Sequence, residues 1–140
     1  RVLGVTVLTS MDHDDVVEIF SDPINLPAKY SHDPEYTFRK VRQFTRLLAE
    51  CGADGVICSA KHVPILKREF PHLLYVCPGI RPMWAAKNDQ EQITTPAQAI
   101  ENVADFIVVG RPILQPPLEI GSPVNAAIRI AEEIASVGKE

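Results

Sequence analysis

The chain has 140 residues, of which 46% are hydrophobic and 23% charged, as is ordinary for one soluble α/β domain with its own core. Its formal net charge of −4 argues against a general nucleic-acid-binding surface, and the absence of any apolar run of about 18 residues argues against a transmembrane helix. Three cysteines without CxxC spacing favour reduced thiols in a cytoplasmic protein over a disulfide or a zinc site.

The first predicted elements are a strand and a short helix. The near-continuous apolar run at residues 2–8 is typical of a strand that is buried on both faces. It ends in Thr9 and Ser10, whose hydroxyls can cap a helix or bond a ligand equally well. A helix is expected from there to about Phe20, because three aspartates crowd its first turn, where exposed backbone N–H groups favour carboxylates.

A loop and a second helix follow. Three Xaa-Pro pairs between residues 22 and 34 predict a long surface loop, since each proline disfavours helix at the residue before it. A helix is then predicted over residues 35–51, with Gly52 as the residue that ends it. Its apolar face consists of Val41, Phe44, Leu48 and Cys51.

The middle of the chain alternates between strands and helices. Residues 55–58 and 73–76 are short apolar runs and predict two more strands. Residues 63–70, between them, predict a helix with a proline in its first turn. The second of these strands leads into a rigid turn, CPGIRP at residues 77–82, and then into a polar loop over residues 83–93.

Two helices and a strand complete the chain. Residues 95–98, TPAQ, form a capping box with proline at the first helical position and predict a helix to about Val103. The β-branched run at residues 106–109 predicts the fourth strand. Ser122 and the proline after it predict the start of a last helix, which extends to about residue 137. The apolar members of that helix are Ile128, Ile130, Ile134 and Val137.

This order of elements predicts a (β/α) barrel. Because each strand is apolar throughout, we expect a parallel sheet that is covered on both faces, with all four C-terminal strand ends on one side. Those ends carry Thr9, Ser10, Ser59, residues 78–81, Gly110 and Arg111. A complete (β/α)₈ TIM barrel has eight units in about 250 residues, so residues 1–140 correspond to half of a single barrel domain. The start at Arg1, without a methionine, also indicates a piece of something longer.

Two glycine–arginine turns are the candidate functional site. Gly110 and Arg111 directly follow the fourth strand, where backbone N–H groups and a guanidinium suit a phosphate. A solvated arginine beside a glycine turn explains that pair equally well. Gly79 and Arg81 after the preceding strand favour the phosphate site, which barrels often build from their last two loops.

Other polar residues give weaker signals. Gln90 in the polar loop could reach across the rim as an amide donor, although a loop glutamine is usually only solvated. The histidines lack metal-ligand spacing, so we expect surface histidines and no metal site. They are His13, His32, His62 and His72.

Several stretches together resemble the C-terminal half of orotidine 5′-phosphate decarboxylase. These are VTVLTSM, DGVICSA, CPGIRP, NDQ, TPAQAI and ADFIVVGRPI, which occur in the family's order and span the whole chain, from the fifth barrel strand to the final helix. The resemblance implies the last four units of a (β/α)₈ barrel, usually a homodimer. The implied activity is conversion of orotidine 5′-monophosphate to UMP and CO₂ without metal or organic cofactor.

The same resemblance implies a set of substrate-binding residues. They are Arg111 and the Gly110 backbone on the 5′-phosphate, Arg81 on the phosphate side, Gln90 between phosphate and pyrimidine, and Thr9 and Ser10 against the base. The chain departs from the family in its loop at residues 83–88, which is usually glycine-rich. It departs again at Asn102 and Val103, which replace the usual glycine before the last strand.

The larger departure is an absence. The FDLK-like strand and the DxKxxD motif, which carry the family's catalytic lysines and aspartates, occur nowhere in residues 1–140. We therefore expect no catalytic residue in this chain and no activity from it alone. An alternative is a non-catalytic, phosphate-binding half-barrel or assembly module that pairs with itself or with a separate first half, because four strands leave exposed sheet edges. A keto-sugar phosphate decarboxylase or synthase is a third reading, which VLTSM and PGIRP disfavour.

Overall fold

The structure, a computed structural model, describes residues 1–20, 33, 35–85 and 94–138. Its elements are β1 (Leu3–Val5), α1 (His13–Phe20), α2 (Tyr36–Glu50), β2 (Gly55–Ile57), the 3₁₀ turn η2 (Ala60–His62), α3 (Val63–Glu69), β3 (Leu74–Cys77), α4 (Pro96–Glu101), β4 (Phe106–Ile107), α5 (Arg111–Leu114) and α6 (Pro123–Ser136). Within this part of the chain, no helix is long and apolar enough to cross a bilayer.

The strands form one parallel sheet. Their order is β1-β2-β3-β4, so each strand lies beside the next one in the sequence. The pairing continues past the strand ends, since Thr6 N donates to Ile57 O at 3.1 Å and Val108 N donates to Cys77 O at 2.9 Å. The predicted parallel α/β fold is confirmed, although the regular strands are shorter than the apolar runs that predicted them.

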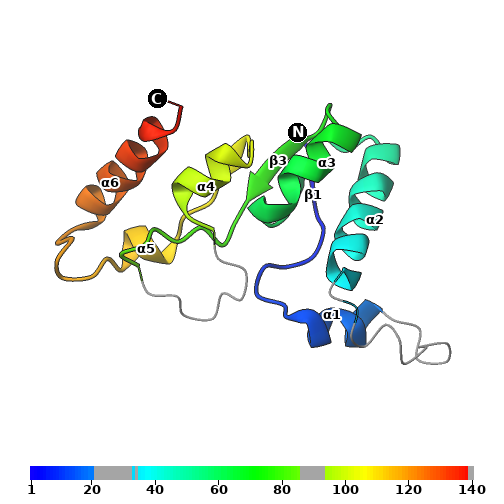
Figure 1. The fold of residues 1–140 in the computed structure, drawn as a ribbon, viewed down its shortest axis with the longest axis horizontal. Helices are drawn as coiled ribbons and strands as arrows, with labels where there is room; N and C mark the ends of the chain where they lie inside the picture. Colours follow the sequence, from blue (N-terminus) through cyan, green and yellow to red (C-terminus); the bar gives the residue numbers. More distant parts are fainter. Residues whose placement is uncertain (21–32, 34, 86–93, 139–140) are drawn as a thin grey trace.

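The core lies between the sheet and its helices. Val56 and Tyr75 point to one face of the sheet, where they pack with Val41 of α2 and Leu66 of α3, all of them almost fully buried. The helices α2, α3, α4 and α6 succeed one another along the molecule in chain order (Figure 1). Helix α2 therefore lies at one end of the row and α6 at the other.

A glycine permits the close packing of α2 on the sheet. Gly4 in the middle of β1 faces Leu48, and a Cβ at this position would lie only 2.2 Å from Leu48 Cδ2. A larger residue fits there only if the Leu48 side chain or the helix that carries it shifts, so a glycine in the apolar run of β1 permits this close packing.

In the part of the chain that the structure describes, the second face of the sheet is largely exposed, so the cover expected on both faces is seen here on one face. The side chains of Val5, Phe106 and Val108 are 52%, 53% and 51% exposed. Alternate residues of a strand point to opposite faces, and the buried cluster with its helices lies on the face of Val56 and Tyr75. The apolar strands required a cover on both faces, but hydrophobicity does not reveal whether that cover lies within the same stretch of chain.

The predicted helix ends are confirmed in detail. Gly52 has a φ of 77°, and α2 ends in a Schellman motif, in which Gly52 N donates to Ala49 O and Ala53 N donates to Leu48 O. Thr95 and Gln98 form the capping box of α4: Thr95 Oγ1 accepts from Gln98 N at 3.2 Å, and Gln98 Oε1 accepts from Thr95 N at 3.0 Å.

Two short turns and the end of one helix were not predicted. Neither η2 nor α5 has the repeat of apolar residues that reveals a longer helix, because each is a single turn. Helix α4 ends at Glu101, two residues before the predicted end, and Val103 has a φ of 56°.

Three side chains are placed differently from the sequence-based expectation. Cys51 is exposed, because it is the C-cap residue of α2 and lies beyond the last packed turn. Ile128 is 50% exposed, because it lies about 200° around α6 from the buried Ile130, at about 100° per residue. His62 is only 8% exposed instead of lying on the surface, because η2 folds its ring against Phe38, with the ring centroids 5.1 Å apart.

Candidate functional site

The C-terminal ends of the four strands carry the candidate site. Because the sheet is parallel and in register, the loops after β1, β2, β3 and β4 leave from the same edge of the sheet. The polar residues expected at this rim follow those strand ends directly. They are Thr9, Ser10, Ser59, Gly79, Arg81, Gly110 and Arg111.

The loop after β4 has an open backbone. Gly110 is exposed and precedes α5, whose first two residues are Arg111 and Pro112. A Cβ placed on Gly110 would meet no protein atom within 4 Å, so the space beside this residue is free for the close approach of a ligand. Arg111, the next residue, is half-buried, and Pro112 fixes the backbone after it.

The loop after β3 lies beside it and is held differently. Ile80 bridges to Thr94, and Arg81 N donates to Thr94 O at 3.0 Å, which ties this loop to the residues before α4. Arg81 is only 5% exposed, and its Nη1 donates to Ile80 O at 3.4 Å. Its guanidinium therefore contacts the loop that carries it and is more buried than that of Arg111.

Thr9 and Ser10, which the resemblance places against the pyrimidine base, follow β1, at the opposite end of the sheet from β4. Thr9 is 8% exposed and Ser10 is exposed, and both follow β1. Two strands, β2 and β3, lie between β1 and β4, so Thr9 and Ser10 follow the strand that is farthest along the sheet from the one before Arg111. The two glycine–arginine loops follow neighbouring strands, β3 and β4. Gln90 lies outside the described residues.

Two residues near the rim were missed by sequence reasoning. Lys61 in η2 is a further cation there, and burial lowers its pKa. His62 beside it is buried with its Nδ1 unbonded, and this burial, together with the charge of Lys61, lowers its pKa to about 4. No sequence signal marked either residue, because a single turn has no periodicity from which its buried side can be read.

A pair of cysteines lies under the rim. Cys58 directly follows β2, and Cys77 is the last residue of the neighbouring strand β3. Both are buried, as expected for reduced core thiols. Their mutual hydrogen bond, followed by burial, raises the pKa of Cys58, so this thiol stays protonated.

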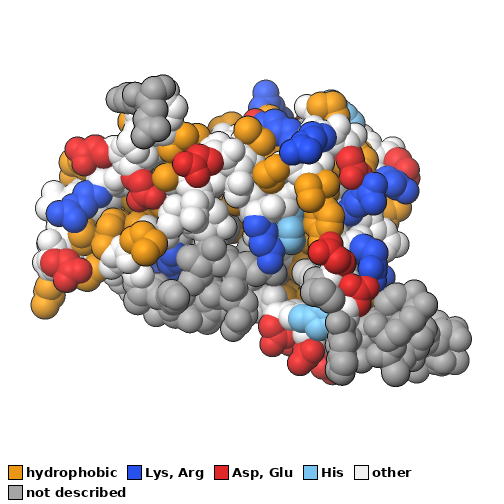
Figure 2. Space-filling model, in the orientation of Figure 1, with side chains coloured by type: hydrophobic (Ala, Val, Ile, Leu, Met, Phe, Trp, Pro, Cys, Tyr) orange, Lys and Arg blue, Asp and Glu red, His pale blue; other side chains and the backbone are white. Residues whose placement is uncertain are grey.

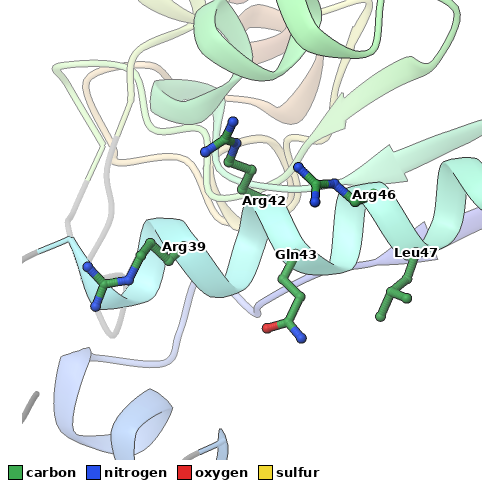
Figure 3. Close-up of a pocket in the computed structure, with 5 residues that line it drawn as sticks. All are labelled: Arg39, Arg42, Gln43, Arg46 and Leu47. Carbon is green, nitrogen blue, oxygen red and sulfur yellow. The ribbon is translucent and has the colours of Figure 1, made fainter.

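Two cavities lie away from the rim. One of about 390 Å³ is on the outer side of α2 and is shown in Figure 3. It is lined by Arg39, Arg42, Gln43, Arg46 and Leu47. The other, of about 320 Å³, lies along α6 and the loop before it. Neither is lined by a residue of the glycine–arginine loops.

Comparison with protein families identifies the family of this chain. The model described as "Orotidine 5′-phosphate decarboxylase / HUMPS family" matches residues 1–127. The chain belongs to this family. The stretches whose resemblance suggested it, from VTVLTSM to ADFIVVGRPI, all lie within the matched residues.

Alignments with relatives from this family include almost all of this chain but only half of each relative. Orotidine 5′-phosphate decarboxylases from Pseudomonas putida (strain F1) and Pseudomonas aeruginosa (strain LESB58) are each 38% identical over 133 residues, which is 95% of this chain and 50% of each relative. The chain therefore spans about half the length of the curated relatives it matches.

Solved structures give the same proportion. Orotidine 5′-phosphate decarboxylase from Lactobacillus acidophilus is 33% identical, with a TM-score of 0.66, over 96% of this chain and 49% of that one. An uncharacterized conserved protein from Geobacillus kaustophilus has a TM-score of 0.63 at 24% identity, over 96% of this chain and 48% of that one, which shows the fold alone. The described sheet is thus half of a TIM-barrel-type fold, as the sequence predicted.

Proposed function

We propose that this chain carries the phosphate- and base-binding half of an enzyme that decarboxylates orotidine 5′-monophosphate to UMP in pyrimidine biosynthesis, in the cytoplasm. One observation carries the proposal: in a member of this family, the neighbouring strands β3 and β4 both end in a glycine–arginine loop at the same edge of the sheet. No other pair of adjacent strand ends in the described chain combines two glycines with two guanidinium groups.

The chemistry of these loops suits a phosphate dianion. The guanidinium of Arg111 offers a planar fork of donors, and the open backbone at Gly110 lets a phosphate oxygen approach closely. Arg81 adds a second guanidinium group on the neighbouring loop of the same rim. Gln90 would bridge the phosphate and the pyrimidine, while Thr9 and Ser10 would contact the base at the far end of the rim.

In this proposal the chain binds the substrate but supplies no catalytic group. Decarboxylation needs charges opposite the developing carbanion and a proton donor, which the family's lysine–aspartate motifs supply, and residues 1–140 contain neither motif. Binding of the remote phosphate would position the substrate and lower the barrier only when those groups are also present. The reaction requires no metal or organic cofactor in this scheme.

The binding role is tested with UMP and uridine as a matched pair of ligands. We expect UMP to raise the thermal midpoint of the chain in a concentration-dependent way and uridine to leave it unchanged, because only UMP carries the phosphate. Arg111→Ala should weaken UMP binding at least tenfold, as loss of one charge-assisted contact implies at about 1.4 kcal/mol per factor of ten.

Arg68→Ala serves as the control for that variant. Arg68 is an exposed arginine in the last turn of α3, and its removal changes the net charge equally without touching the rim. Equal effects of the two substitutions, or equal binding of UMP and uridine, would contradict the proposed phosphate site.

An activity assay tests the division of labour. The isolated chain should show no decarboxylation of orotidine 5′-monophosphate above the uncatalysed rate, even at concentrations that saturate UMP binding. A turnover close to that of an intact family member would refute the claim that the catalytic groups lie elsewhere.

A second candidate function is a non-catalytic, phosphate-binding half-barrel that acts as an assembly module. The exposed apolar face of the sheet favours it, since such a face needs a cover. It would bind UMP without conferring activity on any first half that is added. Restoration of decarboxylation by an added first half would decide for the enzyme.

A further inference from the structure

Helix α2 has a basic outer face, although the chain as a whole is acidic. The net charge of the chain is −4, yet α2 carries four basic residues and one acidic residue. Val41 and Thr45 are buried beneath the helix, whereas Arg39, Arg42 and Arg46 are exposed. Figure 2 shows Lys and Arg side chains gathered over the α2 end of the molecule, with Asp and Glu side chains among them.

The three arginines line one hollow. The cavity of about 390 Å³ on the outer side of α2 is bordered by these arginines together with Gln43 and Leu47. Arg39, Arg42 and Arg46 are three and four residues apart, so they are neighbours on the helix surface. At about 1.5 Å per residue they span roughly 10 Å along the helix. The hollow therefore presents a row of guanidinium groups rather than one isolated charge.

Carboxylates hold two of these guanidinium groups in place. Arg42 Nε donates to Glu69 Oε2 of α3 at 2.7 Å, and Arg39 forms an ion pair with Asp33. Both arginine side chains remain about half exposed. A guanidinium carries five N–H donors, so an arginine that is held by one carboxylate can also donate to a second anion. The two ion pairs thus fix the arginines without closing the hollow.

Arg46 supplies charge that no described carboxylate balances. It is exposed and forms no ion pair with another described residue. Figure 3 shows Arg42 and Arg46 on the same side of α2, and the pair of Arg42 with Glu69 identifies this side as the one toward α3. Like charges four residues apart on a helix repel each other. An anion bound between these two arginines would relieve that repulsion.

We propose that this hollow binds an oligophosphate, a chain of two or three linked phosphate groups, through Arg39, Arg42 and Arg46. Guanidinium forks match phosphate oxygens in bidentate geometry, and a chain of this kind is of the same order of length as the row of three arginines. The amide of Gln43 adds a neutral donor. The site is separate from the rim at the strand ends, because no residue of the glycine–arginine loops lines it.

The size of the hollow favours a small anion over a macromolecule. Pockets for small molecules measure about 300–1,000 Å³, a range that includes this one. A stable protein interface takes roughly 20–30 residues from each partner, whereas five residues of one helix line this hollow. Single-stranded nucleic acid is disfavoured because no aromatic side chain for base stacking is among the lining residues that the structure describes.

The hollow along α6 provides a matched comparison. Its lining includes one arginine, Arg129, beside the two glutamates Glu119 and Glu132. Two carboxylates beside one guanidinium should repel a phosphate chain. Arg129 is exposed, and its removal changes the net charge of the chain by the same amount as removal of Arg46. A substitution at Arg129 therefore controls for the change in total charge.

The test is isothermal titration calorimetry of the full chain with inorganic tripolyphosphate at constant ionic strength. We expect a single site, and at least tenfold weaker binding of orthophosphate, which contacts fewer of the arginines. Arg46→Gln should weaken tripolyphosphate binding at least tenfold, and Arg46→Lys should recover only part of the loss, since it restores the charge but not the fork. Arg129→Gln should leave the affinity unchanged, and so should Arg111→Ala at the rim.

A second ligand distinguishes the source of the phosphate chain. ATP that binds as tightly as tripolyphosphate would indicate a nucleotide, and weaker binding of ATP would indicate a free chain; either result supports recognition of linked phosphates. No binding of tripolyphosphate at about 1 mM, equal losses in Arg46→Gln and Arg129→Gln, or loss of binding in Arg111→Ala would overturn the proposal. It does not depend on the proposed function, since UMP binding is tested at the rim with a different variant.

Discussion

The backbone of Val103 lies in the left-handed region, where a β-branched side chain is disfavoured. With a φ of 56°, this residue closes α4: Val103 N donates to Ile100 O, and Ala104 N donates to Ala99 O. These are the two hydrogen bonds of a Schellman motif, whose C′ position is usually glycine. The sequence had already singled out this site, because Asn102 and Val103 replace the glycine that is usual in the family.

Val103→Gly should therefore stabilise the chain. Removal of the Cβ relieves about 1–2 kcal/mol of left-handed strain, while the greater freedom of glycine in the unfolded chain costs roughly 0.4–1 kcal/mol. We expect a net gain of about 0.5–1 kcal/mol in urea unfolding. Val103→Ala keeps the Cβ and should gain clearly less. A glycine variant less stable than the wild type would show that the contacts of the half-exposed valine outweigh the strain.

His62 makes the stability depend on pH. Its pKa is lowered to about 4 in the folded chain, chiefly by burial, whereas an unfolded histidine titrates near 6.5. Between these values the unfolded state binds more protons, so the free energy of unfolding falls as the pH falls from about 6.5 toward 4. The full effect amounts to about 3 kcal/mol, at about 1.36 kcal/mol per pKa unit.

The measurement is the urea midpoint at pH 7.5, 6.5, 5.5 and 5, a range in which most carboxylates stay ionised. The wild type should lose stability through this range, whereas His62→Phe, which can still pack on Phe38, should lose much less. His72→Phe is the control, because His72 is exposed and should follow the wild type. An equal slope in the wild type and His62→Phe would mean that His62 is not the group responsible.

At the scale of elements, one carboxylate joins three of them at the N-terminal edge of the sheet. Asp105, which precedes β4, accepts from Tyr75 N of β3 at 2.9 Å and from Lys67 Nζ of α3 at 2.7 Å. Lys67 also donates to Val103 O at 2.9 Å, so the turn between α4 and β4 is held at the same point. This cluster lies at the opposite edge from the candidate site, the edge that serves stability in (β/α) barrels.

Asp105→Ala should destabilise the chain by about 1–3 kcal/mol, because it leaves the backbone N–H of the buried Tyr75 without its acceptor. Lys67→Ala removes only a partly exposed cation and should cost less than about 1 kcal/mol. Urea unfolding gives both values, and UMP binding at the opposite edge should be unaffected by either change. If Lys67→Ala cost as much as Asp105→Ala, the ion pair rather than the backbone hydrogen bond would dominate the cluster.

At the scale of the whole molecule, most of the fold was predictable because its signals are local. Apolar runs with tight turns predicted four parallel strands, and the capping residues Thr95 and Ser122 predicted two helix starts that the structure confirms. The rim followed from the topology alone. The substrate-binding roles of Thr9, Ser10, Arg81, Gln90, Gly110 and Arg111 stay predictions.

What was not predictable depends on longer-range packing. Nothing local distinguishes Ile128, which faces water, from Ile130, which faces the core, because both belong to an apolar series. Nor does the sequence reveal that Arg81 is buried, since burial depends on how its loop packs, including the bridge between Ile80 and Thr94. The exposed sheet face is the largest such case, because apolar strands indicate that a face is buried but do not indicate which segment packs against it.

The three cysteines differ in their access to solvent, and this makes the chain its own chemical reporter. Cys51 is exposed at the end of α2, whereas Cys58 and Cys77 are buried. Because an alkylating reagent reacts with an accessible thiolate, the folded chain should be labelled first at Cys51. Labelling of Cys58 and Cys77 requires local opening of the sheet, so its rate measures how often β2 and β3 separate from the helices that cover them.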